Sequence, residues 1–571
     1  MSEIQLWTTI FIVLSFGVYI YIAWRSRVNE TESFYVAKHG VPTVANGAAI
    51  AADWMSAASF ISMAGLLAFL GSDGSVYLMG WTGGYVLLAM LIAPYLRKWG
   101  KYTVPEFVGE RYNETVRTVA AAAAIIISFT YVVGQMNGGG IVFSRFLGIG
   151  LTGGVLIAAG VIFIYAVLGG MKGITWTQVA QYTVLIVAYL IPAVAVAQQV
   201  TGFPIPQVSF GTILDELNAI GTEMGLQEYT QAFAQQPMID MFLVTLALMI
   251  GTAGLPHVII RFYTTRTVRG SRHSAFWALL FIAILYTTAP AVGAFTKLNL
   301  LEGVKGTAVD ALPQWISNWS TTGLVSIKEG AETINSVSND PAVGADLTIN
   351  NDILVLASPE IAGLPAPIIG LVAAGGMAAA LSTAAGLLLV ISSSVSHDFY
   401  FRRIRKHADD HERLLVGRIA MGLAVVVAIV AGINPPAFVA EVVAFAFGMA
   451  ASSFFPAIVL GIFWKRCNAK GAAAGIVVGL GFTITYMIWT LDVFGTTAND
   501  YILGISPQGI GAVGAAVNFI VAIIVSKLTS PPPKHIEEMV ENMRYPAVTA
   551  QSGARTAPGS ESAGRPEGGE S

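Results

Sequence analysis

The sequence predicts an all-α polytopic membrane protein with about thirteen transmembrane helices. Of its 571 residues, 55% are hydrophobic and only 11% are charged, whereas a soluble chain carries about 25% charged residues. Many separate apolar runs reach the ~18 residues that mark a candidate membrane-spanning helix. The basic residues also favour one side of the predicted loops. These three observations indicate a chain whose bulk lies within a bilayer.

The apolar runs give thirteen expected spans, at residues 4–24, 42–70, 76–96, 116–146, 151–170, 176–200, 237–261, 274–296, 364–396, 412–432, 436–464, 471–491 and 508–527. They divide the chain into six parts: an extra helix and loop (1–41), a first set of five spans (42–200), an outer loop (201–236), a second set of five spans (237–464, with a loop at 297–363), two C-terminal helices (465–530) and a tail (531–571).

The tail contains a Pro-rich start and a Gly/Ser/Pro/Glu-rich end, so we expect it to be disordered. It is too short for a fused catalytic domain, and we do not expect an enzyme. In the 297–363 loop, the stretch 308–319 has amphipathic spacing. It is either an interfacial helix or a helix on the surface of a solvated loop.

The distribution of the basic residues predicts how the chain is oriented in the membrane. With the N-terminus outside, only four of the 31 Lys and Arg residues fall in outside segments: Arg145, Lys297, Lys305 and Lys328. This asymmetry predicts a multi-pass protein of the inner (plasma) membrane with its C-terminus in the cytoplasm. The N-terminal residues lack the basic region of a cleavable signal peptide, so the first helix is expected to be retained. The single cysteine, Cys467, excludes a disulfide within the chain and a multi-thiolate metal site.

Each set of five spans begins with a helix that is interrupted near its middle. In the first set the interruption is at Ala52–Ser56, where Asp53 places a carboxylate at bilayer depth. In the second it is the Gly- and Pro-containing stretch 251–257. Interrupted helices at matching positions point to a transport site between two inverted repeats. The alternative is that the glycines only allow close helix packing.

A second stretch supplies oxygen atoms for a cation. Ser382 and Thr383 follow Ala379 by three and four residues, so on a helix both hydroxyls lie near the Ala379 carbonyl. A loosened helix at Ala52 and Met55 would add two carbonyls. Five oxygens suit sodium, which prefers oxygen ligands. The alternative is that each hydroxyl bonds a carbonyl of its own helix.

Other polar residues near the interruptions have two or more interpretations. Asp53 could balance a cation, take a proton or bond the N–H groups of its own broken helix. His257 could donate to a carboxylate or simply pack, and Trp54 could wall a small pocket. Arg261 and Glu441 are assigned to interfacial or gating contacts.

Several motifs then occur in the order found in the sodium:solute symporter family, which the chain resembles over roughly 33–470. They are Ala52-x-x-Met55-Ser56, residues 102–107 (YTVPEF), 254–262 (GLPHVIIRF), Ala379-x-x-Ser382-Thr383 and 461–466 (GIFWKR). The resemblance implies a leucine-transporter-like fold with a 5+5 inverted-repeat core and alternating access. It also implies sodium, the co-transported ion, at Ala52, Met55, Ala379, Ser382 and Thr383.

Within that family the chain looks most like cation/acetate (monocarboxylate) symporters, through residues 170–182 (GMKGITWTQVAQY) and 251–258 (GTAGLPHV). This implies sodium-coupled import of a small monocarboxylate, with acetate the leading substrate. The expected substrate-binding residues lie at the two interruptions: Asp53, Trp54, Ser56, Ser59, Thr252, Gly254, Leu255, Pro256 and His257. The implied partners are the carboxylate, sodium, membrane lipid and, as for some relatives, a small two-helix companion subunit; no nucleic acid is expected.

The chain departs from the family pattern at two places. Sugar carriers have an acid and an amide where Ala58 and Ser59 stand here, so sugar recognition is not expected. Members with a second sodium have an aspartate where Gln178 stands, which argues for one sodium. The remaining alternatives are a carrier of another organic solute such as proline, and a sensor or channel that uses the same fold.

Overall fold

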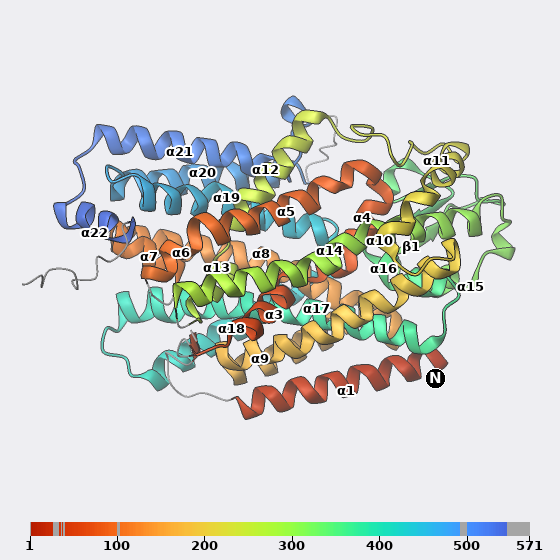
Figure 1. The fold of residues 1–571 in the computed structure, drawn as a ribbon, viewed down its shortest axis with the longest axis horizontal. Coiled ribbons are helices and arrows are strands. Elements are labelled where there is room, and N and C mark those ends of the chain that lie inside the picture. Colours follow the sequence, from red (N-terminus) through yellow and green to blue (C-terminus); the bar gives the residue numbers. More distant parts are fainter. Residues whose placement is uncertain are drawn as a thin grey trace, which may run out of the picture.

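The long helices of the computed structural model run roughly along its longest axis, as Figure 1 shows. The structure describes residues 2–26, 34–35, 37, 40–99, 103–265, 267–491 and 500–544. The segments between α9 and α12 and between α14 and α17 gather at one end, here called the loop end. The opposite end carries α22 and is called the tail end. The first residues of α1 lie at the loop end (Figure 1).

In the described part of the chain, the bundle contains these α-helices: α1 (Glu3–Arg25), α3 (Thr43–Trp54), α4 (Met63–Leu70), α5 (Ser75–Leu87), α6 (Ala93–Trp99), α7 (Val104–Arg111), α8 (Glu114–Leu147), α9 (Leu151–Thr201), α12 (Met238–Gly254), α13 (Pro256–Tyr263), α14 (Val268–Val304), α17 (Ala366–Ser393), α18 (Asp410–Ile433), α19 (Val439–Phe463), α20 (Ala469–Trp489) and α21 (Ile510–Leu528). Short π- and 3₁₀-helical turns join several of them: η2 (Ala58–Ser62), η3 (Gly71–Gly74), η4 (Leu88–Ile92) and η9 (Ser394–Ile404).

The number of spans depends on how broken helices are counted. Ten helical segments in the described residues are long and apolar enough to cross a membrane, and eleven if the bent pair α12–α13 is one span. Two places account for the difference from the thirteen expected. Spans were predicted at 42–70 and 76–96, where residues 58–99 count as one apolar segment although Gly71 (φ 56°, ψ −131°) breaks the helix between α4 and α5. The apolar helix at 151–164 is short. Each of the thirteen predicted stretches is nevertheless helical in the structure.

Gly170 separates the fifth and sixth predicted spans, 151–170 and 176–200, within the element α9. Its φ of 52° and ψ of −163° are non-helical and kink the helix there. A Cβ at this position would lie 2.6 Å from the Phe34 ring, so the kink also needs the small residue.

Small residues set the centre of the bundle. Every residue of α17 from Val372 to Ser393 is buried, and the run from Ala373 to Gly386 is almost entirely Ala, Gly, Ser and Thr. Such residues let helix backbones approach closely in a bilayer. This helix packs against α8, α9 and α1 and meets the broken helix α3, which places the two sequence stretches singled out above beside each other.

The loop end is a folded cover. The 201–236 loop contains α10 (Pro206–Ser209), η5 (Phe210–Ile213) and α11 (Leu214–Glu223). The next loop contains η6 (Val309–Ala311), α15 (Gln314–Ser320), η7 (Pro341–Val343), η8 (Asn351–Ile353), α16 (Leu354–Ile361) and a small sheet of β1 (Val325–Ile327), β2 (Val337–Ser338) and β3 (Leu347–Ile349). β3 lies between the other two, antiparallel to β1 and parallel to β2. Trp315 and Trp319 are buried, so the predicted amphipathic piece packs on protein.

The expectation of a disordered tail is wrong for its first part. α22 (Lys534–Arg544) follows the Pro run, with Ile536, Val540 and Met543 buried. Lys465 forms an ion pair with Glu541, and Lys98 donates to the Asn542 carbonyl at 2.6 Å. Tyr102 of the YTVPEF motif and the predicted disordered stretch after Ala547 lie outside the described residues.

Candidate functional site

The first interruption releases two backbone carbonyls. α3 ends at Trp54, and Met55 has a non-helical ψ of 63°. In a continuous helix the carbonyls of Ala52 and Asp53 would accept from the N–H groups four residues on. Instead Ser56 N–H donates to Trp54 O at 2.8 Å, and Ala57 N–H donates to Gln135 Oε1 at 2.9 Å. Both carbonyls are therefore free to take other partners.

The unbroken helix α17 supplies those partners. Ser382 Oγ lies 2.6 Å from the Ala52 carbonyl oxygen and 2.9 Å from the Ala379 carbonyl oxygen. Thr383 Oγ1 donates to the Asp53 carbonyl at 2.7 Å. A hydroxyl has one proton, so Ser382 donates to only one of these carbonyls at a time. Ala52, Ala379, Ser382 and Thr383 are fully buried, so the result is a cluster of closely spaced oxygens shielded from solvent.

This cluster contains most of the residues predicted to hold sodium. Ala52, Ala379 and Ser382 meet directly, and Thr383 reaches the Asp53 carbonyl rather than a carbonyl of its own helix. Met55 is fully buried in the interruption next to them. The alternative prediction is that both hydroxyls hydrogen-bond only to carbonyls of their own helix. Thr383 does not do so.

Asp53 has two side-chain partners. Its Oδ2 accepts from Arg261 Nε at 3.2 Å, with both side chains almost fully buried. Its Oδ1 accepts from Gln178 Nε2 at 3.0 Å, and the same amide donates to the Ser382 carbonyl at 2.7 Å. Gly386 makes room for the carboxylate, because a Cβ there would lie 2.6 Å from Oδ1. A buried charge pair with further hydrogen bonds avoids the high cost of an isolated buried charge.

Of the two roles expected for Arg261, the interfacial one is wrong, and the gating one stays a prediction. The side chain is 1% exposed, and its Nη1 also lies 3.2 Å from Thr175 Oγ1. The residue reaches Asp53 across 208 positions of sequence. Only the fold brings the two together, and no local pattern predicts the pairing.

The second interruption lies between α12 and α13. Leu255 has an extended backbone (φ −72°, ψ 120°) and α13 begins with Pro256, so the two helices meet at a bend of 40°. The first N–H groups of a helix have no acceptor within it. Pro256 has no N–H group, so the N–H groups of His257 and Val258 are the ones without an acceptor within α13.

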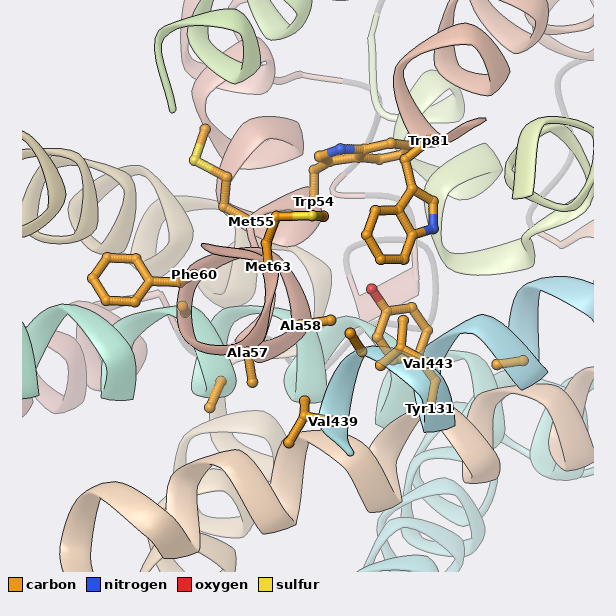
Figure 2. Close-up of a cluster of buried hydrophobic side chains, with 14 of the residues drawn as sticks. Trp54, Met55, Ala57, Ala58, Phe60, Met63, Trp81, Tyr131, Val439 and Val443 are labelled. Carbon is orange, nitrogen blue, oxygen red and sulfur yellow. The ribbon is translucent and has the colours of Figure 1, made fainter. Parts of the chain in front are cut away.

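A small cavity of about 10 Å³ lies between the two interruptions. Five of the predicted substrate residues line it: Asp53, Trp54, Ser56, Ser59 and His257. Seven further residues complete the wall: Ala58, Trp81, Tyr131, Val258, Tyr286, Val443 and Phe447. Figure 2 shows the indoles of Trp54 and Trp81 beside each other and the Tyr131 hydroxyl pointing toward them.

Four side chains of this wall carry buried polar atoms without a well-aligned hydrogen bond among the described residues: Trp54 Nε1, Ser56 Oγ, Trp81 Nε1 and His257 Nδ1. Two of them still interact with tyrosine hydroxyls, Ser56 with Tyr131 and Trp54 with Tyr286. The His257 ring stands edge-on to Tyr131 with centroids 5.3 Å apart, and Ser59 Oγ lies 2.8 Å from Tyr286 OH. Buried polar groups are nearly always paired, so the Trp81 and His257 nitrogens are the wall atoms most open to a polar ligand.

Four predicted substrate residues do not line the cavity. Thr252 donates back to the Leu248 carbonyl at 2.7 Å and packs under Gly84. Gly254 lies against the Ala450 carbonyl, and Leu255 and Pro256 form the interruption itself. Sequence reasoning missed four residues of the cavity wall: Trp81, Tyr131, Tyr286 and Phe447. An aromatic residue in a membrane helix is usually interpreted as a packing residue when its neighbours are unknown.

Comparison with known proteins agrees with this architecture. Residues 34–479 match the Sodium:solute symporter family. The chain is 36% identical to an uncharacterised symporter of Cupriavidus necator, covering 94% of this chain and 93% of the relative. It is 32% identical to the uncharacterised symporter YwcA of Bacillus subtilis, covering 80% of each.

A solved structure shares the fold. A Na⁺-coupled sialic acid symporter, in a substrate-bound outward-open state, superposes with a TM-score of 0.68 and 16% identity over 93% of this chain and 99% of that one. The architecture is thus the leucine-transporter-like fold expected from the sequence. On these grounds the chain belongs to the sodium:solute symporter family and is a multi-pass, sodium-coupled solute symporter.

Proposed function

We propose that this symporter imports a small monocarboxylate, with acetate the leading substrate, together with one sodium ion by alternating access. The observation that carries the proposal is the pair of unpaired nitrogens on Trp81 and His257 in the wall of the cavity. Asp53 connects this cavity to the oxygen cluster, because it lines the cavity while its carbonyl accepts from Thr383. An anion and a cation would therefore bind close together.

Sodium binds in this proposal where Ala52, Met55, Ala379, Ser382 and Thr383 converge. The carbonyl of Ala52 lies 2.6 Å from Ser382 Oγ, so a cation among these atoms replaces the hydrogen bonds they make with each other. Hard cations favour such uncharged and charged oxygen ligands. The Asp53 carboxylate is already paired with Arg261, which leaves the carboxylate of the substrate to balance the ion.

The residues around the cavity suit a small carboxylate in polarity. Its volume of about 10 Å³ holds roughly one water molecule, so the proposal requires the surrounding helices to open when the solute enters. The free N–H groups at the start of α13 and the positive end of its dipole favour an anionic head. The aromatic faces of Trp54, Trp81 and Tyr131 would cover the apolar end of the solute. Ala58 and the already bonded Ser59 offer little to sugar hydroxyls.

The proposed orientation puts the N-terminus outside and the C-terminus in the cytoplasm of the inner membrane. α1 begins at the loop end and α22 lies at the tail end (Figure 1). The few basic residues of the outside segments, such as Lys297 and Lys305, fall toward the loop end. The positive-inside rule then makes the tail end cytoplasmic.

Uptake of radiolabelled acetate into proteoliposomes tests the proposal. With an inward sodium gradient, acetate should accumulate, and replacing sodium by potassium should abolish accumulation. Unlabelled propionate should compete, while proline and glucose should not. Sodium-driven uptake of proline or glucose without acetate uptake would contradict the assignment. Fluxes that pass without saturation would indicate a channel instead.

A further inference from the structure

We infer that a groove on the membrane-facing side of the bundle binds an anionic phospholipid, with Arg403 holding its phosphate. The groove lies between α8, the α17–η9 continuation and α18, and has a volume of about 460 Å³. It is lined only by Ile, Val, Leu, Phe and Ala side chains, among them Ile125, Phe129, Val395 and Val416. It is referred to below as the α8/α18 groove.

Arg403 is fixed below this groove by two hydrogen bonds to α8. Its Nε donates to Thr118 Oγ1 at 3.1 Å and its Nη2 to the Glu114 carbonyl at 2.9 Å. Thr118 precedes Ile125 by seven residues and Phe129 by eleven, so all three lie on one face of the helix. Seven residues correspond to ~10 Å along the axis. The guanidinium is thus placed about two turns nearer the tail end than the apolar lining.

The charge around Arg403 leaves it available for a phosphate. Its side chain is exposed, and among the described residues it has no carboxylate partner. The neighbouring acids are already engaged: Glu412 pairs with Arg405 at 2.7 Å and Glu114 with Arg117 at 3.5 Å. Arginine recognises phosphate through its planar fork of donors. The Arg403 guanidinium, which has no carboxylate partner among the described residues, would bind the phosphate of a phospholipid, and the apolar groove would hold its acyl chain.

The size of the groove favours a lipid chain over another helix. The lining on α18 runs from Val416 to Val427, which is ~16 Å of helix. Its volume of about 460 Å³ then corresponds to an average cross-section of about 28 Å². A helix with its side chains is ~10–12 Å across and would need more. An extended acyl chain fits such a section lengthwise.

Native mass spectrometry of the purified full-length protein tests the site with phosphatidylglycerol and phosphatidylcholine as probes. The wild type should retain phosphatidylglycerol in preference to phosphatidylcholine. Arg403→Gln should weaken that preference about fivefold, the effect of one basic residue near an anionic surface. Arg405→Gln, which removes an equally exposed but paired cation, should leave it unchanged.

A second pair of variants tests the groove itself. Ala424→Phe fills the groove and should reduce retention of both lipids, whereas Val430→Phe, exposed on the same helix but outside the lining, should not. Four results would overturn the inference: no headgroup preference in the wild type, full preference in Arg403→Gln, equal binding of soluble glycerol phosphate, or a dimer that Ala424→Phe abolishes. The last would assign the groove to a second copy.

Discussion

Ser382 Oγ lies 2.6 Å from the carbonyl oxygen of Ala52, although the two residues are 330 positions apart in the chain. Ala52 belongs to the first helix of the first five-span set and Ser382 to the second set. The contact therefore joins the two halves of the bundle at the point where one helix is broken. Any cation bound here would hold both halves together, which is the property that alternating access requires of a coupling ion.

The first prediction concerns the two hydroxyls. Ser382→Ala and Thr383→Ala should each lower the apparent sodium affinity about tenfold or more, because a dry site cannot replace a lost ligand with water. Sodium activation of acetate uptake, normalised to the amount of protein in the membrane, measures this. Thr383→Ser keeps the hydroxyl and should retain most of the affinity.

Ser453→Ala is the matched control for the hydroxyl variants. Ser453 is equally buried, but its Oγ donates only to the Met449 carbonyl of its own helix, at 2.6 Å. It should keep wild-type sodium dependence. If Ser382→Ala and Thr383→Ala behave like this control, the hydroxyls serve the helices and not an ion.

The second prediction concerns the pair formed by Asp53 and Arg261. Removing one partner leaves a buried charge uncompensated, which costs about 3–5 kcal/mol in comparable pairs. Arg261→Gln should therefore lower the thermal unfolding midpoint of the detergent-purified protein sharply. The double variant Asp53→Asn/Arg261→Gln should recover much of the loss. Simply additive losses would mean that the two side chains do not stabilise each other.

The third prediction concerns substrate recognition. His257→Phe keeps a ring of similar shape but removes the unpaired Nδ1, so the KM for acetate should rise about tenfold or more while the sodium dependence changes less. His273→Phe, on the exposed side of α14, is the control. An unchanged KM in His257→Phe would make the histidine a packing residue.

The sequence predicts the two helix interruptions and the oxygen cluster of this site, but not its buried ion pair. Gly, Pro and a mid-membrane Asp mark the two interruptions, since each disturbs the helical ladder locally. The i, i+3, i+4 spacing also predicts that Ala379, Ser382 and Thr383 lie close together. The pairing of Asp53 with Arg261 depends on how α3 and α13 pack, and the sequence contains no local trace of it.

Two other features escape sequence reasoning for different reasons. The cavity wall includes Trp81, Tyr131 and Phe447. In the sequence these aromatic residues cannot be distinguished from aromatic residues that only pack between helices. α22 follows three prolines and is rich in charge, which resembles a disordered tail. Its order comes from burying Ile536, Val540 and Met543 against the tail end of the bundle, a tertiary effect that composition does not reveal.

The fourth prediction concerns Gln178. Its Nε2 bridges Asp53 Oδ1 and the Ser382 carbonyl, so a positively polarised amide stands between two oxygens that could otherwise contact a second cation. Transport by the wild type should then be nearly independent of voltage. Gln178→Asp removes the amide donor and adds a carboxylate, which should allow a second sodium to bind. In that variant an inside-negative potential, set by potassium and valinomycin, should stimulate uptake.

Gln178→Asn keeps an amide and is the control for this variant. It should remain insensitive to voltage even if the shorter side chain lowers the rate. Strong voltage stimulation of the wild type would show that extra positive charge moves already, through Asp53 or another group.

The most direct test of the account measures both solutes at once. Proteoliposomes with the wild-type protein take up ²²Na⁺ and [¹⁴C]acetate together, with the membrane potential clamped at zero. One oxygen cluster beside one anion cavity predicts about one sodium for each acetate, and loss of both fluxes together in Ser382→Ala/Thr383→Ala. Acetate uptake that proceeds without ²²Na⁺, or that survives in the double variant with unchanged sodium dependence, would contradict the account.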